Sequence, residues 1–555
     1  MNIPADNLND FILELIDTCF KSQNKRQGDY ERYRNYFLFG DKNGKQSPLN
    51  RLKPHIELKS SFLYSSGTAS FSVIVGEEKD KLLHLQAQKF NRIISADWKD
   101  GNFDLINQMA VEWALINGLS FIKLIPEGRT AVPYFCHPSS MGVYREDIPY
   151  TDRQEVVIQK YLIPKAELYR QLMKAGKDPT ELMKKLVTTR RQDNPVMQKQ
   201  IEAASSPAIN MPGDSGGAGG RADFLSFSTN EYNASANDNL VEMNEIWVWD
   251  DEIDDYRTIT STNDHIIFNR PNIFIPKELP FVAISPNPLI DYFWGISEIA
   301  IQIPLQEGIN QRMKQIKHAN ELADNPPIFS QGTLDDTGED FEAWKPGARF
   351  SSNDPNAKIQ PMFLNTIPNT IQEIEAYSQF MNDLGGITDI MQGKGSAGVR
   401  AEGHASLLSR ISSSRPKNKA LIIEDSVNKI ATLLAKVIRR NDKAHYEIYV
   451  NNQSEKFVIS EFTPDFTVCV NNHSTSPLFA YDVEQQMTQL LQLGIIDNKL
   501  FVETVNPPNK EAILAYLENK SAPTQGDIQK TIKILDNVKK IEKAEAELTA
   551  TGKGR

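Results

Sequence analysis

The chain has few cysteines and no long apolar run. Its 555 residues include only Cys19, Cys136 and Cys469, a spacing that fits a reducing compartment and gives no sign of a disulfide framework. No run of 18 apolar residues occurs, so we expect no membrane span. The opening residues, MNIPADNLNDFILELI, carry acidic side chains where a secretory signal needs positive charge, so we expect no signal peptide.

The chain also lacks the excess of basic residues that broad DNA binding requires. Lys and Arg number 61 against 72 Asp and Glu, which gives a net charge of −11. Neutralisation of phosphates supplies most of the affinity for DNA, so a protein that grips DNA over its whole surface would be basic. This chain therefore either does not bind nucleic acid or contacts it without binding it tightly. Its length suggests three or four domains.

Local signatures of catalysis and of metal binding are missing from the sequence. There is no G-x-x-x-x-G-K-[ST], and none of the eight histidines has metal-ligand spacing. Residues 393–398 have G-x-G-x-x-G spacing, but a predicted helix precedes them, so we interpret them as a flexible loop. The acidic run 250–255 departs from the calcium-loop pattern and is interpreted as a hairpin tip. We expect no enzymatic activity, no cofactor and no metal.

The sequence does contain two helical patterns around an acidic, turn-rich insert. A first helix is predicted from Pro304 to Leu322, and Asn325-Pro326-Pro327 ends it. Its apolar stripe consists of Leu305, Ile309, Met313 and Ile316. The return helix has Ile371, Ile374, Met381 and Leu384 on one face, and Gly385-Gly386 weakens it.

Further periodic segments surround this central unit. Residues 8–37 and 103–117 are predicted helices, and strand patterns follow at 120–146 and from 244. Residues 203–239 are rich in Ala, Ser, Gly and Asn, which predicts a mobile surface loop. The segment KALIIEDSVNKIATLLAKVIRR predicts a long buried helix. Together these patterns predict an α+β, mainly helical fold.

A glycine- and serine-rich stretch with scattered cations follows the return helix. Alone it would be interpreted as a solvated surface loop, but its place between two long helices favours a functional loop. Its basic side chains are Lys394, Arg400, His404, Arg410 and Arg415.

At this point the chain resembles the portal proteins of tailed bacteriophages, especially those of short-tailed phages. The resemblance covers roughly residues 5–520 and lies in the order and local pattern of several segments. They include NRLKPHIELKSSFLYSS, VEWALINGLSFIKL, CHPSSMGVYRED with KYLIPKAELYR, and NEIWVWDDEIDDY. The most specific are FWGISEIAIQIPLQEGINQRMKQIKHANELADNPPIF and GGITDIMQGKGS with the helix after it.

The resemblance implies a division of the chain into the parts of a portal subunit. These are a wing at 1–290 with its loop 203–239, a first stem helix at 291–323, a clip at 324–370, a second stem helix at 371–390, a tunnel loop at 391–415, a wing return at 416–505 and a crown with C-terminal tail at 506–555. The stem residues that we single out are Gln306, Asn310, Lys314 and Lys317.

The resemblance also implies function and partners. Twelve subunits would form a ring at one capsid vertex, the channel for packaging and ejection of double-stranded DNA without sequence specificity. Terminase large subunit, and later head-completion or tail adaptor proteins, would dock on the clip, and the major capsid protein would surround the ring. The ring would belong to the virion and assemble in the host cytoplasm. Acidic and aromatic clip residues are candidate contacts: Asp335, Asp336, Glu339, Asp340, Phe341 and Trp344.

The negative net charge of the chain is consistent with a channel along which DNA slides. Twelve copies at −11 each would carry −132, and an acidic bore keeps a duplex from adhering. A few cations per loop could then touch the phosphates without reading bases; we expect Lys394 and Arg400 to do so. The alternative is a head–tail adaptor or a capsid scaffold protein that assembles without lining a DNA channel.

Overall fold

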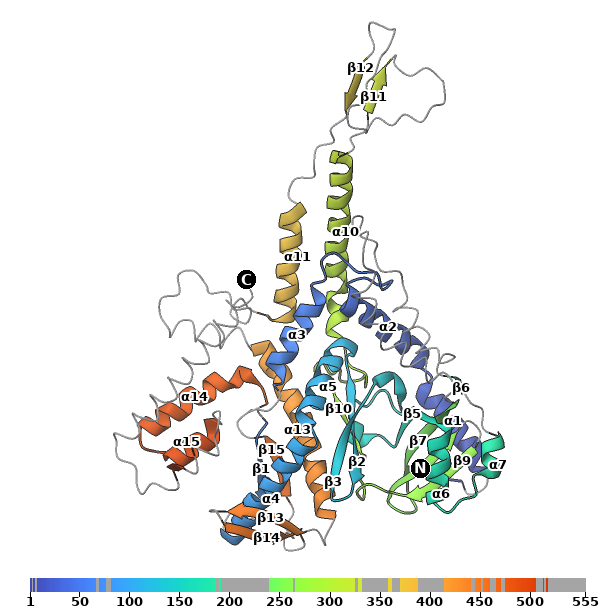
Figure 1. The fold of residues 1–555 in the computed structure, drawn as a ribbon, viewed down its shortest axis with the longest axis vertical. Coiled ribbons are helices and arrows are strands. Elements are labelled where there is room, and N and C mark those ends of the chain that lie inside the picture. Colours follow the sequence, from blue (N-terminus) through green and yellow to red (C-terminus); the bar gives the residue numbers. More distant parts are fainter. Residues whose placement is uncertain are drawn as a thin grey trace, which may run out of the picture.

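The computed structural model describes an α+β protein with a long helical projection (Figure 1). The residues that it describes are 1, 3–4, 7–65, 69–75, 81–185, 189–190, 239–262, 265–324, 328–331, 358–361, 370–387, 414–440, 445–450, 453–459, 466–470, 475–505, 513 and 516–517. The predicted loop at 203–239 lies outside these residues except for Asn239.

The N-terminal helices connect two parts of the core. The predicted helix at 8–37 is divided into α1 (Leu8–Phe20) and α2 (Gln23–Phe39). Lys21 and Ser22 keep right-handed helical backbone angles, so the chain bends here without leaving the helical region. The bend has a physical reason, because α1 packs on a separate small cluster with β5 while the end of α2 enters the main core. The prediction of one unbroken helix was therefore wrong.

Antiparallel sheets form the rest of the body. The largest has the order β4–β5–β7–β8–β9, from β4 (Met141–Val143), β5 (Val156–Pro164), β7 (Asn239–Asp250), β8 (Asp255–Thr262) and β9 (His265–Pro271), and β6 (Thr189–Arg190) also pairs with β7. A second has the order β10–β2–β3, from β10 (Phe281–Ile284), β2 (Ser120–Glu127) and β3 (Thr130–Cys136). Smaller pairs join β1 (Phe71–Val75) to β15 (Phe466–Val470) and β13 (His445–Val450) to β14 (Gln453–Val458).

The acidic run 250–255 is the turn between β7 and β8, as predicted. Asp250 is buried and its carboxylate lies 2.6 Å from Arg257 Nη2, whereas Asp251, Glu252 and Asp254 are exposed. One buried ion pair thus closes a solvated acidic turn.

Helices cover the sheets and enclose one main hydrophobic cluster. They are α3 (Leu52–Leu63), α4 (Lys81–Asp100), α5 (Phe103–Asn117) and α13 (Ser414–Arg440). The predicted burial of α13 is confirmed, since Val427, Ile430, Leu434 and Ile438 are fully buried. Further helices lie at the periphery: α6 (Lys165–Lys174), α7 (Thr180–Lys185), α14 (Pro477–Gln492) and α15 (Asn498–Val505). Among the described residues, no helix has the length and apolar content to cross a membrane.

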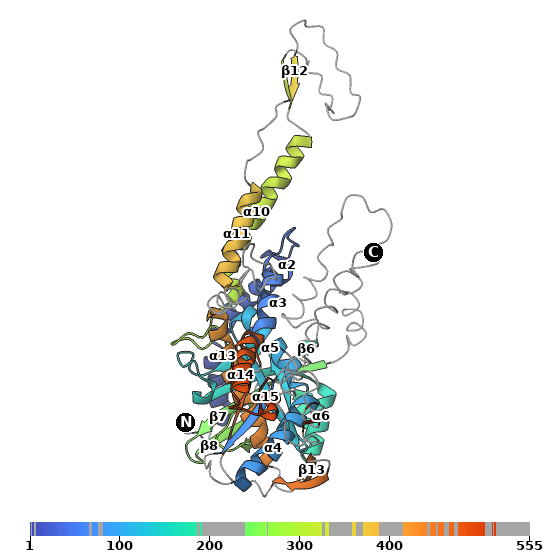
Figure 2. The same cartoon turned by 90° about the vertical axis from the view of Figure 1, so that its left-hand side faces the viewer.

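Two long helices leave the body side by side (Figures 1 and 2). They are α10 (Glu298–Asp324) and α11 (Thr370–Gly385), and β11 (Ile328–Gln331) pairs with β12 (Lys358–Pro361) beyond their far end. The helix predicted to begin at Pro304 instead begins six residues earlier, with Pro304 inside it and exposed. Two glycines fix this start, because a Cβ on Gly295 would lie 2.7 Å from the Gly118 carbonyl oxygen and both residues have positive φ.

Candidate functional site

Contacts between the projecting helices include an ion pair and a close approach of a ring to a backbone. Arg312 Nε of α10 lies 2.5 Å from Glu373 Oε2 of α11. One turn nearer the body, a Cβ on Gly308 would lie 3.1 Å from the Tyr377 ring, so the glycine lets the aromatic ring lie against the helix backbone. We call this pair, α10 with α11, the stem.

Two predicted stem residues hold the segment between α2 and α3 against α10. Gln306 is buried; its Nε2 donates to the Leu49 carbonyl at 2.8 Å, and its Oε1 accepts from the Arg51 amide at 3.0 Å. Asn310 donates to the Gly40 carbonyl at 2.7 Å and accepts from the Ser47 hydroxyl at 2.6 Å. The side-chain amides of Gln306 and Asn310 therefore link the stem to the segment between α2 and α3.

The other two predicted stem residues face solvent. Lys314 and Lys317 are exposed, and Lys317 lies 3.8 Å from Glu321 one turn along α10. Among the described residues, Lys314 forms no ion pair. Exposed pairs of this kind contribute little to stability, so these cations remain available to a partner.

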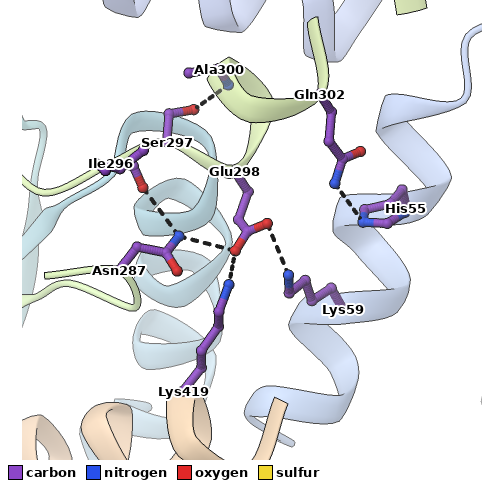
Figure 3. A network of polar contacts seen from close by, with 9 residues as sticks. All are labelled: His55, Lys59, Asn287, Ile296, Ser297, Glu298, Ala300, Gln302 and Lys419. Carbon is purple, nitrogen blue, oxygen red and sulfur yellow. Dashed lines mark hydrogen bonds and ion pairs between the residues drawn. The ribbon is translucent and has the colours of Figure 1, made fainter. Parts of the chain in front are cut away.

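The base of the stem is organised around one buried carboxylate, that of Glu298 (Figure 3). Lys59 Nζ of α3 lies 2.9 Å from its Oε2, and Lys419 of α13 pairs with its Oε1. Asn287 Nδ2 also donates to Oε1 at 3.0 Å. The side chains of Lys59 and Glu298 are only 1% and 3% exposed. One carboxylate thus joins two helices and a loop of the body to the first turn of α10.

The electrostatics of this cluster favour the ionised carboxylate. Burial alone would raise the pKa of Glu298, but Lys59 and Lys419 outweigh it and hold the pKa below its usual 4.5. Burial lowers the pKa of Lys59 below its usual 10.5, and Glu298 opposes this shift. The position of Glu298 in the first turn of α10 also favours its ionised form, because the N-terminal end of a helix stabilises negative charge.

A buried histidine of α3, His55, lies beside α10 one turn further along, at Gln302. Gln302 Nε2 lies 2.8 Å from His55 Nε2, so the amide donates to a neutral imidazole. Burial, with help from Lys59, lowers the pKa of His55 from 6.5 to about 4. Gly385, the last residue of α11, has no room for a side chain here, since a Cβ would lie 2.2 Å from the His55 ring. The base therefore contains the first turns of α10 and the last residue of α11.

Sequence reasoning missed this cluster, although one signal was present. Ser297 Oγ accepts from the Ala300 amide at 3.1 Å, which is the geometry of a helix N-cap, and Glu298 follows it. The pair Ser-Glu before an apolar stripe predicts a helix start. The lysines could not be found in this way, because Lys59 and Lys419 are far from Glu298 in sequence.

Most of the remaining predicted residues lie outside the described part of the chain. This holds for four tunnel-loop residues, Lys394, Arg400, His404 and Arg410. It also holds for all the clip residues: Asp335, Asp336, Glu339, Asp340, Phe341 and Trp344. Arg415 is described and lies exposed in the first turn of α13, four residues before Lys419.

Two comparisons found known proteins that are similar to this chain. The family described as "Phage SU10 portal protein" matches residues 161–521, more than half of the chain. No curated protein matches. A solved structure titled "Neck of empty GTA particle computed with C6 symmetry" aligns with 86% of this chain and 92% of its own, at 10% identity and a TM-score of 0.37; at those values it carries no inference. On the family match, the chain belongs to the phage SU10 portal protein family.

Proposed function

We propose that twelve copies of this chain form the ring at one capsid vertex through which double-stranded DNA enters and leaves the head. Portal proteins are structural, non-enzymatic components of the phage particle, and the family match supports that coarse role. The observation that carries the finer proposal is the stem, a helix pair projecting from an α+β body with a strand pair beyond its far end.

The parts of a portal subunit are proposed on this stem. Residues 291–323 and 371–390 are the stem helices, and α10 and α11 fall largely within them. Residues 324–370 are the clip, where terminase and later adaptor proteins dock through the acidic and aromatic residues named above. Residues 391–415 face DNA, 1–290 and 416–505 form the wing, and 506–555 form the crown.

The base of the stem suits a part that bears load. A helix pair that guides a moving duplex needs a fixed direction, and direction requires contacts from several sides. Glu298 receives such contacts from α3, α13 and the loop before α10, and Gln306 and Asn310 add two more further along. Buried polar contacts of this type serve orientation better than stability.

Native mass spectrometry and negative-stain imaging of the purified full-length protein test the proposal together. Twelve chains of 62.7 kDa give a particle of about 750 kDa. We expect that mass and a ring with a central hole. A particle of this size without a hole would favour the adaptor or scaffold alternative, and a stable monomer would contradict both.

A further inference from the structure

The segment from α2 to the start of α3 carries a charge opposite to that of the whole protein. Residues 21–53 contain nine Lys and Arg against three Asp and Glu, a net charge of +6 in a chain of −11. This segment precedes the residues that match the portal family, which begin at 161. Neither the family match nor the proposed channel explains its charge.

Two of these cations lie on one face of α2, and a third lies just before the helix begins. Lys25 and Arg32 are exposed and, with Gly28, follow the spacing i, i+3 and i+7 within α2, while the exposed Lys21 lies in the bend between α1 and α2. We call these four residues the α2 stripe. Residues at this spacing share a helix face, and at 1.5 Å per residue the part from Lys25 to Arg32 extends about 10 Å. The opposite face holds the buried Arg26 and Tyr30.

The cations of the stripe form few ion pairs inside the subunit. Among the described residues, Lys21 and Lys25 form no ion pair. Arg32 lies 4.0 Å from Glu307, and both side chains are half exposed, so water screens the pair. The nearest acids on α2, Asp29 and Glu31, lie at the edges of the exposed face and are partly buried.

Gly28 has no internal explanation either. It lies inside α2, where glycine is the least favourable residue after proline. A Cβ at this position would meet no atom within 4 Å, so no neighbour in the subunit requires its small size. Glycine at such a position leaves the surface flat and lets another backbone approach closely.

The basic face continues beyond the helix. The Lys42 carbonyl accepts a hydrogen bond from Asn35 at 3.1 Å, which ties the following loop to α2. Lys42 and Lys45 of this loop are exposed, and neither forms an ion pair within the described residues. The loop itself is held on the stem by Asn310. Figure 1 shows α2 running from the base of α10 to α1, so the backbone that carries these cations is held by the helix and the stem.

The composition of the stripe fits a phosphate backbone rather than a protein. Protein interfaces depend on buried aromatic and aliphatic anchors, and the exposed residues between Lys21 and Arg32 include none. Backbone contacts to nucleic acid come mainly from Lys, Arg and small polar side chains, and they carry no sequence information. We propose that the α2 stripe, with Lys42 and Lys45, binds the phosphate backbone of double-stranded DNA on a surface distinct from residues 391–415.

A salt titration of duplex binding tests this surface on the full-length protein. The variant K21Q/K25Q/R32Q and the wild type are titrated with a short labelled duplex of mixed sequence by fluorescence anisotropy. The slope of log K against log salt is negative, and each lost phosphate contact lowers its magnitude by about 0.9. For three lost contacts we expect the magnitude to fall by up to about 2.7 and the affinity to be at least about tenfold lower at moderate salt.

A matched control removes the same charge elsewhere. K165Q/R170Q/K174Q alters three cations of α6, and we expect its affinity to stay within about twofold of wild type. An equal loss in this control would mean that only net charge matters, and would overturn the proposal. Unchanged binding by the α2 variant would overturn it too.

A second variant guards against misfolding as an explanation. Gly28→Glu places a negative charge within the stripe where space is open, and glutamate favours helix more than glycine does. We expect its Tm to equal or exceed that of wild type while duplex affinity falls; Gly28→Ala, which adds only a methyl group, should lower the affinity less. If Gly28→Glu weakens the binding of polyglutamate but not the binding of duplex DNA, the stripe binds an acidic protein and the DNA proposal fails. Native mass of each variant separates these outcomes from failure of ring assembly.

Discussion

At the scale of single residues, the base of the stem depends on Glu298 more than on any other side chain in the described cluster. It balances two lysines, one of them almost fully buried. Removing one partner of a buried ion pair leaves the other charge without compensation, which costs far more than the pair itself contributes. The cluster therefore tolerates loss of its carboxylate poorly.

The first prediction follows from that balance. Glu298→Gln should lower the free energy of unfolding by about 3 kcal/mol, because Lys59 stays buried with no countercharge. Chemical denaturation of the full-length protein measures this. Glu321→Gln is the control on the same helix, since Glu321 is exposed and 3.8 Å from Lys317; it should cost less than about 1 kcal/mol. Equal effects of the two substitutions would contradict the role of Glu298.

One buried and one partly buried histidine, His55 and His137, predict a pH dependence of stability. Burial lowers the pKa values of His55 and His137 from 6.5 to about 4. His55 faces Lys59, Lys419 and Glu298, and His137 faces Arg34. Between pH 7 and pH 5 the unfolded chain takes up protons on these histidines and the folded chain does not, so stability falls as the pH falls.

The expected loss is about 2 kcal/mol for each histidine between pH 7 and pH 5, from about 1.4 kcal/mol per pKa unit. Denaturation curves at both pH values measure it. His55→Gln with His137→Gln should flatten the dependence whatever its stability at pH 7. A slope as steep in this double variant as in wild type would show that other groups are responsible.

At the scale of elements, sequence periodicity predicts helices well and their tertiary partners poorly. The apolar stripes of α10, α11 and α13 are local patterns, and all three helices are present. The start of α10 was misplaced because Pro304 was taken as its first turn, whereas Ser297 caps the helix. The convergence of Lys59, Glu298 and Lys419 could not be predicted, because only the folded chain brings α3, α10 and α13 together.

The contact between α11 and α3 can be tested with two glycines. Gly385→Ala should lower the free energy of unfolding by about 1–3 kcal/mol, because the new Cβ would overlap the His55 ring, which is held by Gln302. Gly28→Ala should instead raise it by about 1 kcal/mol, since its site is open and helical. Thermal or chemical denaturation of both variants gives the sign directly; a neutral Gly385→Ala would mean that His55 moves freely.

The proposed tunnel loop gives a functional prediction. Replacing Lys394 and Arg400 with alanine should alter DNA retention or packaging and leave the ring intact, because two weak phosphate contacts per subunit would be lost. An in vitro packaging assay with the full phage machinery measures this, with native mass as the assembly control. Packaging and retention identical to wild type would refute the role of both residues.

At the scale of the whole molecule, shape and charge lead to the same proposal. The stem gives each subunit a long axis, visible in both views (Figures 1 and 2), and twelve such axes around a ring would enclose a bore. The net charge of −11 per chain would make the assembly strongly acidic, which disfavours tight DNA adhesion. Local cations, on the α2 stripe and in residues 391–415, would then determine where the duplex contacts the ring.

The measurement that tests this account most directly is a cryo-electron microscopy reconstruction of the assembled full-length protein. We expect α10 and α11 of every copy to surround a central hole, with residues 391–415 facing its axis. A reconstruction that turns the stem outward, or that places residues 393–403 on the outer rim, would contradict the account.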